Sequence, residues 1–296
     1  MTLSVIVVYG FAVLATLGSW TYFRTRRIAR PPFGVMNLSD VAIAMTGILL
    51  VPFLYLWLPL PVVVVLVAAI TLSALQITLE PVIRGAVLWG LCATLLGLDL
   101  ALGLVVSVKG PAFLVVNNLI VVIVVVGVAN LWAQSGLRAS HTALFAAALV
   151  VYDAVTTWSF TVTLDLFVKL TKAPLFPLVG WGLTRVSTSY LVGLGDLLFV
   201  ALFPLVMRKA YGRTAGLCAL VAGLAALGLV FALVLNDVIG HTIPAMVFLG
   251  PLIVAQYLYW RLARGGERST RQYLRADPLP ARTPTLVTAA EGGEQR

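Results

Sequence analysis

The sequence has little charge and few cysteines. Of its 296 residues, 10% are charged and 61% are hydrophobic, whereas about a quarter of an average soluble domain is charged. A soluble fold of this length needs more polar surface, but lipid solvates apolar side chains directly. The two cysteines exclude a disulfide framework, and no Cys-x-x-Cys motif or Cys/His cluster indicates a zinc site. We therefore expect a multi-pass membrane protein.

Acidic residues are also scarce, because 11 Asp and Glu stand against 20 Lys and Arg, a formal charge of +9. A basic balance can indicate nucleic-acid binding, an anionic membrane face or membrane topology. The basic residues cluster at the ends of apolar runs and do not interleave with aromatic residues, as a groove for single-stranded nucleic acid would require. The lipid bilayer is therefore an expected partner, and nucleic acid is not.

Long apolar runs bounded by charge, proline or glycine fill most of the chain. At about 20 residues for each crossing, this composition provides for roughly nine membrane spans. The runs lie at about 3–23, 41–58, 62–79, 86–108, 112–134, 142–162, 188–207, 214–236 and 243–260. The sequence thus predicts an all-α membrane domain of nine transmembrane helices over residues 1–262. A disordered, basic cytosolic tail is expected over 263–296, where the polar composition cannot support a folded core.

The distribution of basic residues predicts the orientation in the membrane. Four arginines follow the first run closely, and three basic residues follow the seventh. The loops on the opposite side contain only Lys109, Lys169, Lys172 and Arg185. Because basic residues favour the cytoplasmic side, we expect the N-terminus outside and the C-terminus in the cytosol. The preference for arginine over lysine, and a chain end without an organelle-retention string, favour a microbial cell membrane.

Three charged side chains lie inside the predicted spans, and all are aspartates: Asp99, Asp153 and Asp196. An acid at mid-bilayer costs about 2.5–3.5 kcal/mol or more, so a functional role is the first interpretation. The alternative is a neutral acid hydrogen-bonded to another helix. Each aspartate is eight or nine residues from the outer end of its span, which is roughly 12–14 Å below the outer surface. Asp153 and Asp196 could therefore meet across a helix pair.

Short motifs accompany two of these aspartates. Asp153 follows Tyr152, and Asp196 ends a Gly-Leu-Gly-Asp segment at 193–196, whose glycines leave room for an extended peptide beside the acid. A Pro-Ala-Met segment at 244–246 begins the ninth predicted span. Its proline lacks a backbone donor and leaves carbonyl groups that a partner strand could use. Glycine and proline are common in membrane helices, so each motif alone is a weak signal.

Taken together, these residues resemble the intramembrane aspartyl proteases of the presenilin and signal peptide peptidase type. That family has Tyr-Asp in the sixth span, Gly-x-Gly-Asp in the seventh and Pro-Ala-Leu at the start of the ninth, and this chain has its three motifs in the same spans and order. The first five spans match in number only. Met246 stands where the family has Leu, a volume-conserving change. The short connection 163–187 and the N-out orientation look more like signal peptide peptidase and microbial homologues, so a single uncut chain is expected.

The resemblance implies a presenilin-like bundle and an aspartic endopeptidase that cleaves within transmembrane segments of membrane proteins or signal peptides, without metal or organic cofactor. Asp153 and Asp196 would be its catalytic residues. Two acids close together in a low dielectric share one proton, so that one activates a water and the other protonates the scissile carbonyl oxygen. A helical substrate would unwind locally and pair as a strand. The residues implied to bind the substrate are Tyr152, Gly193, Leu194, Gly195, Pro244, Ala245 and Met246.

Other interpretations remain open at this point. In a proton-coupled secondary transporter, Asp99, Asp153 and Asp196 would relay protons or balance substrate charge. A non-catalytic scaffold is a third class. An odd number of spans and the absence of a visible repeat weigh against an inverted-repeat carrier. Asp99 lies outside the family pattern, so it is either an acid hydrogen-bonded within the bundle or part of a water route. Tyr152 either lines the active site or packs in the bundle.

Overall fold

A computed structural model describes residues 2–28, 38–108, 110–159, 162–170, 172–182, 190–236, 245–268 and 272. Eight helices in this part of the chain are long and apolar enough to cross a membrane, as expected for a multi-pass membrane protein. Two π-helical turns, η1 and η2, continue α4 and α6 directly. The helices are α1 (Thr2–Thr25), α2 (Leu38–Trp57), α3 (Leu60–Leu79), α4 (Ala86–Ala101), η1 (Leu102–Ser107), α5 (Pro111–Gln134), α6 (Ala139–Ala154), η2 (Val155–Ser159), α7 (Val162–Leu170), α8 (Leu194–Tyr211), α9 (Arg213–Leu235) and α10 (Met246–Arg264).

The helix α8 is not among these eight. It has 18 residues, and three of them, Asp196, Arg208 and Lys209, are charged. It corresponds to the predicted span 188–207 but begins later, because the preceding residues form a strand, and it also ends later. Nine spans, the predicted number, are reached only if α8 also crosses the membrane.

The later end of α8 changes the environment of one cation. Lys209, which the predicted boundaries leave in a cytosolic loop, is buried within α8. Its Nζ donates to the carbonyl oxygens of Ala133, at 2.8 Å, and Leu137. The Ala133 carbonyl lies in the last turn of α5, where the helix dipole favours a positive charge, and Leu137 follows that helix. Lys209 therefore joins α8 to α5.

The connection between the sixth and seventh predicted spans, 163–187, contains most of helix α7 and a short strand, so one small two-stranded sheet accompanies the otherwise helical membrane fold. Strand β1 (Leu178–Trp181) pairs antiparallel with β2 (Tyr190–Gly193). In their register, Leu178 is opposite Gly193 and Gly180 is opposite Leu191. Apolar and aromatic residues fill both segments and suit a buried hairpin. The strand β2 leads directly into α8.

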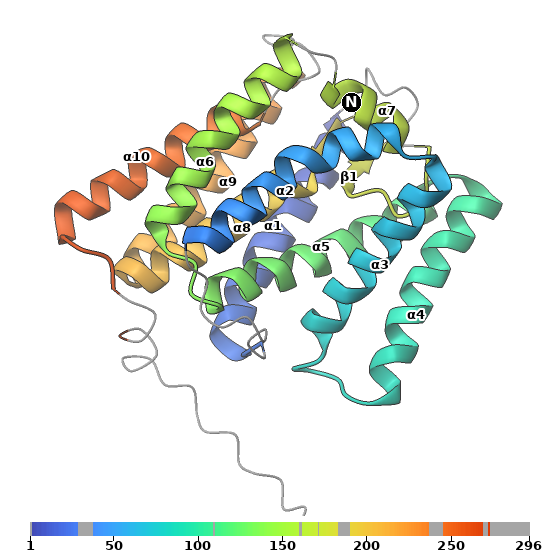
Figure 1. Ribbon diagram of the computed structural model, residues 1–296, viewed down its shortest axis with the longest axis horizontal. Coiled ribbons are helices and arrows are strands. Elements are labelled where there is room, and N and C mark those ends of the chain that lie inside the picture. The colour runs from blue at the N-terminus through green and yellow to red at the C-terminus, as the bar shows by residue number, and fades with distance from the viewer. Residues whose placement is uncertain are drawn as a thin grey trace, which may run out of the picture.

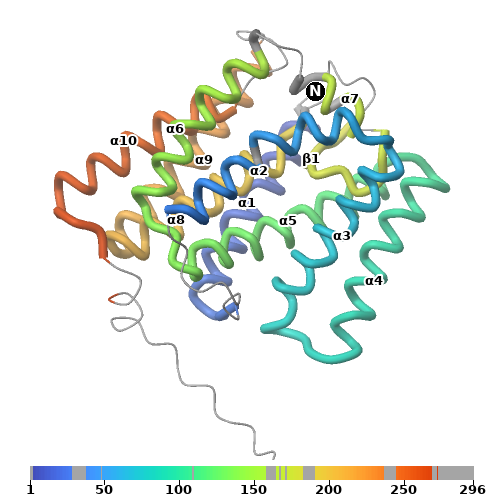
Figure 2. The backbone as a smooth tube through the Cα atoms, viewed as in Figure 1, coloured from blue at the N-terminus to red at the C-terminus, as the bar shows by residue number. Residues whose placement is uncertain are grey.

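The helix α8 lies at the centre of the bundle, and nearly all its side chains after Asp196 are buried. It contacts α1, α5, α6, α9 and α10. Figure 1 shows α6 and α10 together near one edge of the molecule and α4 at the opposite edge, and Figure 2 traces the same path of the chain. Large apolar side chains such as Trp57, Val105 and Leu262 are exposed, as expected for helices that face lipid.

Helices α6 and α10 pack unusually closely at Gly250. A Cβ atom on Gly250 would lie 2.1 Å from Val150 Cγ2 and 3.1 Å from the carbonyl oxygen of Ala146. Small residues at helix contacts let membrane helices approach in this way. The two helices that carry Asp153 and Met246 are thus held against each other.

The last helix extends past residue 262, the predicted end of the membrane domain. Helix α10 continues to Arg264, and the residues that follow it up to 268 make specific contacts with the bundle. Residues 269–271 and 273–296, which make up most of the predicted tail, lie outside the described residues.

Candidate active site

The structure brings the two predicted catalytic aspartates together. Asp153 is near the end of α6 and Asp196 is in the first turn of α8, and both are partly buried. The two carboxyl groups are near enough to interact electrostatically, and α6 contacts α8. The Oδ2 atom of Asp153 also accepts a hydrogen bond of 3.2 Å from the backbone N–H of Met246, the first residue of α10. The three motifs therefore converge from three helices.

The Gly-x-Gly-Asp segment forms the junction between β2 and α8. Gly193 has extended backbone angles and caps the helix, and its backbone forms a hydrogen bond with the Asp196 carboxyl group. An acid at the third helical position commonly reaches back to the capping residue in this way. The aspartate also complements the positive end of the helix dipole. The motif thus fixes the Asp196 carboxyl group at the N-terminus of α8.

The two glycines of this motif have different surroundings. A Cβ on Gly193 would lie 3.3 Å from Asp196 Oδ2, which is closer than ordinary van der Waals contact. A Cβ on Gly195 would meet no atom within 4 Å, and Gly195 is exposed. The lack of a Cβ at Gly193 therefore avoids a clash with the Asp196 carboxylate. The lack of a Cβ at Gly195 leaves open space beside that residue.

The helix that carries Asp153 changes its geometry immediately after it. Residues Val155–Ser159 form the π-helical turn η2, and the Thr156 hydroxyl donates to the carbonyl oxygen of Tyr152 at 2.9 Å. Single π-turns within helices occur frequently at functional sites. The turn places Asp153 at the end of the regular part of α6.

Two asparagines of α5 seal the outer edge of β1. The Asn118 amide donates to the carbonyl oxygen of Gly180 at 2.9 Å and accepts from its N–H at 3.1 Å. Asn117 donates to the carbonyl oxygen of Leu178 at 3.0 Å. Alternate residues of a strand direct their backbone groups to opposite edges, so Leu191, opposite Gly180, directs its groups to the outer edge of β2. In the described part of the chain, this sheet has no third strand.

Asp99, the third membrane aspartate, is fully buried in α4 and has a different partner. Its Oδ2 accepts a hydrogen bond of 2.9 Å from the backbone N–H of Leu175. Leu175 has a φ of 58° in the left-handed region, which is strained for this residue type. Asp99 therefore holds the bend that leads into β1, and this agrees with the expected acid hydrogen-bonded within the bundle.

Two predicted substrate-binding residues make contacts with the protein itself. The Tyr152 hydroxyl donates to the carbonyl oxygen of Leu49 on α2 at 3.4 Å, which favours a packing role for this side chain. The backbone N–H of Leu194 donates to the carbonyl oxygen of Pro177 at 3.0 Å. Leu194 thus links the start of α8 to the segment just before β1.

The Pro-Ala-Met segment is only partly described, because Pro244 lies outside the described residues. Ala245 is partly buried and precedes α10 as its capping residue. Met246 is buried, and its backbone N–H rather than its side chain contacts Asp153. Sequence reasoning assigned this segment to the substrate and missed its contact with the catalytic acid.

Sequence reasoning also missed the two asparagines that hold β1. A signal was present, because Asn117 and Asn118 are adjacent amides in the otherwise apolar run 112–134. Polar side chains within a membrane span need hydrogen-bond partners. Their partners are backbone groups of a strand that was itself not predicted.

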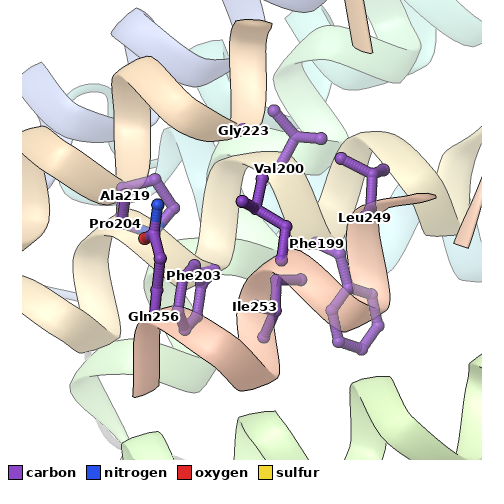
Figure 3. A pocket seen from close by; sticks show the side chains of 10 residues that line it. Phe199, Val200, Phe203, Pro204, Ala219, Gly223, Leu249, Ile253 and Gln256 are labelled. Carbon is purple, nitrogen blue, oxygen red and sulfur yellow. The ribbon is translucent and has the colours of Figure 1, made fainter. Parts of the chain in front are cut away.

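A small pocket lies along the groove between α8, α9 and α10 (Figure 3). Phe199 and Val200 line it from the face of α8 that carries Asp196 one turn earlier, and Leu249 lines it one turn after Met246. Its space is about 10 Å³, enough for one water molecule. The pocket is thus mainly apolar and begins one helical turn from Asp196 and Met246 along α8 and α10.

Within the described residues, no three His, Cys, Asp or Glu side chains gather as the ligands of a metal ion would. The site that the structure assembles is thus a pair of carboxyl groups, oriented by backbone N–H groups, beside a two-stranded sheet to which no further strand of the described residues is added. No protein-family model matches the chain, and no curated protein matches it.

Proposed function

We propose that this protein is an intramembrane aspartyl protease of the presenilin and signal peptide peptidase type. It hydrolyses a peptide bond within a transmembrane segment of a membrane protein or signal peptide. In this proposal α8 also crosses the bilayer, giving nine spans in the cell membrane with the N-terminus outside and the C-terminus in the cytosol. The observation that carries the proposal is the convergence of Asp153, Asp196 and the Met246 N–H from three separate helices.

The chemistry follows from two acids in one poorly solvated site. Close carboxyl groups in a low dielectric do not both ionise, so Asp153 and Asp196 share one proton. The ionised carboxylate takes a proton from a water molecule while the oxygen of that water attacks the scissile carbonyl carbon. The protonated member gives its proton to the carbonyl oxygen. The Met246 N–H orients Asp153, and the Gly193 backbone orients Asp196, so neither carboxyl group must reorganise during the reaction.

The β hairpin provides the means to hold an unwound substrate. An unwound transmembrane segment exposes backbone groups that need partners, and an open strand edge supplies them. Asn117 and Asn118 occupy the outer edge of β1, so the substrate adds to the outer edge of β2 at Leu191. Because β2 continues into α8, a strand at this edge runs towards Asp196, and the open space at Gly195 gives it room.

The contact of Asp99 favours hydrolysis over the competing proton-coupled transport. A relay would place Asp99 in line with the other two aspartates, but its carboxylate holds the Leu175 backbone. Asp99 therefore serves as a matched control for the two catalytic acids, since it is also an aspartate buried within a membrane helix.

Purified protein in lipid vesicles tests the proposal with a transmembrane reporter peptide and mass analysis of the products. We expect Asp153→Asn and Asp196→Asn each to abolish cleavage, while Asp99→Asn, whose amide oxygen can still accept from Leu175, keeps most of it. Wild-type protein that cuts no embedded peptide in any lipid composition would contradict the proposal. Cleavage that survives in both catalytic variants would contradict it equally.

A further inference from the structure

Residues 264–268, which begin with the last residue of α10, bind the ends of two other helices. Glu267 contacts the N-terminus of α6. Its Oε2 accepts from the backbone N–H of Ala139 at 2.8 Å and of Ser140 at 3.4 Å. Its Oε1 accepts from the Ser140 hydroxyl at 2.7 Å and pairs with Arg138 Nε at 3.1 Å. Arg138, the capping residue of α6, offers no side-chain cap of its own, so Glu267 supplies it.

The two arginines of the same segment bind the C-terminus of α8. Arg264 Nη1 donates to the carbonyl oxygen of Tyr211 at 2.7 Å. Arg268 donates from Nη2 to the carbonyl oxygen of Arg208 at 3.2 Å, and from its backbone N–H to that of Ala210, also at 3.2 Å. These carbonyls belong to the last turn of α8, where backbone acceptors lack partners within the helix.

The charges of the segment suit both helix ends. A carboxylate is favourable at the positive N-terminus of α6, and guanidinium groups are favourable at the negative C-terminus of α8. The side chain of Glu267 is only 10% exposed, although its partner Arg138 is 53% exposed. Sheltered, charge-assisted hydrogen bonds of this kind are stronger than exposed ion pairs.

The two helices that this segment joins are those that carry the aspartates. Asp153 is 14 residues from Ala139, at the start of α6, and Asp196 is 15 residues from Tyr211, at the end of α8. At about 1.5 Å for each residue, both acids lie roughly 21–23 Å from the bound helix ends. The contacts at 264–268 therefore keep Asp153 and Asp196 at the same level along antiparallel helices.

We propose that residues 264–268 form a strap that fixes the axial register of α6 and α8, with Glu267 and Arg268 as positioning residues for the two aspartates. The inference rests on the proposed proteolytic function. The strap begins at the C-terminal end of α10, and the N-terminal end of the same helix supplies the Met246 N–H to Asp153. A slip of one residue along a helix moves an aspartate by about 1.5 Å, and a misplacement of about 1 Å can cost 100-fold in rate.

Kinetics of strap variants test this role. We expect Glu267→Ala to lower kcat about ten-fold or more with KM nearly unchanged. The strap determines the positions of the two aspartates and does not contact the edge of β2 where the substrate would pair. Glu267→Gln, which keeps an acceptor for the Ala139 N–H, should lose less. A chain that ends after residue 266 lacks both Glu267 and Arg268 and should lose at least as much kcat as Glu267→Ala, while a chain that ends after residue 272 should match the wild type. Glu80→Ala is a control acid in the turn between α3 and α4, and should leave kcat unchanged.

A distance measurement tests the register without any catalytic activity. Spin labels fit at Val151 on α6 and Val221 on α9, which are both exposed, after replacement of the exposed Cys218. Helix α9 packs against α8 and reports its position. Loss of Glu267 should shift or broaden the measured distance, and the chain that ends after residue 272 should not change it.

The two proposals fail in different ways. A wild type that cleaves nothing refutes the proposed function, and the spin-label distances then decide the strap alone. A Glu267→Ala variant with an unchanged distance distribution overturns the strap. Unchanged kcat in that variant, with only a lower melting temperature, also overturns it, because Glu267 would then merely stabilise the fold.

Discussion

The hydrogen bonds between Asn118 and Gly180 give a quantitative test of how the β hairpin is held. Both bonds are buried, at 2.9 Å and 3.1 Å. Asn118→Ala leaves the N–H and the carbonyl oxygen of Gly180 without these partners, at about 1–3 kcal/mol for each group. Exchange of the amide hydrogen reports on the N–H group alone, and its share of about 1–3 kcal/mol corresponds to roughly a 5–150-fold change in the opening equilibrium constant. The Gly180 amide should therefore exchange its hydrogen faster by about this factor.

Hydrogen exchange of the protein in detergent micelles measures this effect. The matched control is Asn117→Ala, which removes one bond to the carbonyl oxygen of Leu178 and leaves both bonds of Gly180 in place. Cleavage of the reporter peptide should fall in Asn118→Ala, because β1 is held less firmly and β2 pairs with β1. Wild-type exchange at Gly180 in the Asn118→Ala variant would refute this explanation, as would equal acceleration in both variants.

Three further outcomes are expected. Gly193→Ala should lower kcat because its Cβ crowds Asp196 Oδ2 at 3.3 Å, while Gly195→Ala, which meets no atom within 4 Å, should mainly raise KM; equal effects on kcat would contradict this. Gly250→Ala should lower the melting temperature of the protein, since overpacking costs about 1–3 kcal/mol, and Val150→Ala in the same chain should restore part of the loss; no recovery would place the clash elsewhere. Asp99→Leu should destabilise the fold by about 1–3 kcal/mol in chemical denaturation, because the Leu175 N–H loses its acceptor, whereas Asp99→Asn should be nearly neutral; a strong loss in both variants would indicate that the charge of Asp99 matters.

Hydropathy predicts the membrane helices well because it reads a property of each residue that is independent of neighbours in space. The helices α1, α3, α5 and α9 begin and end within a few residues of the predicted runs. Hydropathy fails at residues 190–193, which are as apolar as a helix but pair with β1. Short apolar runs do not distinguish a buried strand from a helix, and the partner strand, 178–181, is not adjacent in the sequence.

The candidate site was predictable where a motif carries its own chemistry, and not where a backbone group does. An aspartate within a long apolar run is visible in the sequence, as Asp153 and Asp196 are. The contacts made by the backbone N–H of Met246 and the backbone of Gly193 do not depend on residue type, so the sequence does not reveal them. The contacts of Glu267 were equally hidden, because a polar segment after the last span has the composition of a free tail.

The bond from Met246 to Asp153 also bears on which residues position 246 can accept. Since the backbone supplies the donor, any apolar side chain that fills the buried space keeps this bond, whereas proline, which lacks the N–H, does not. Methionine, where the family that this chain resembles has leucine, leaves the backbone contact with Asp153 intact. An unfamiliar residue in a short motif can thus preserve the chemistry that the motif stands for.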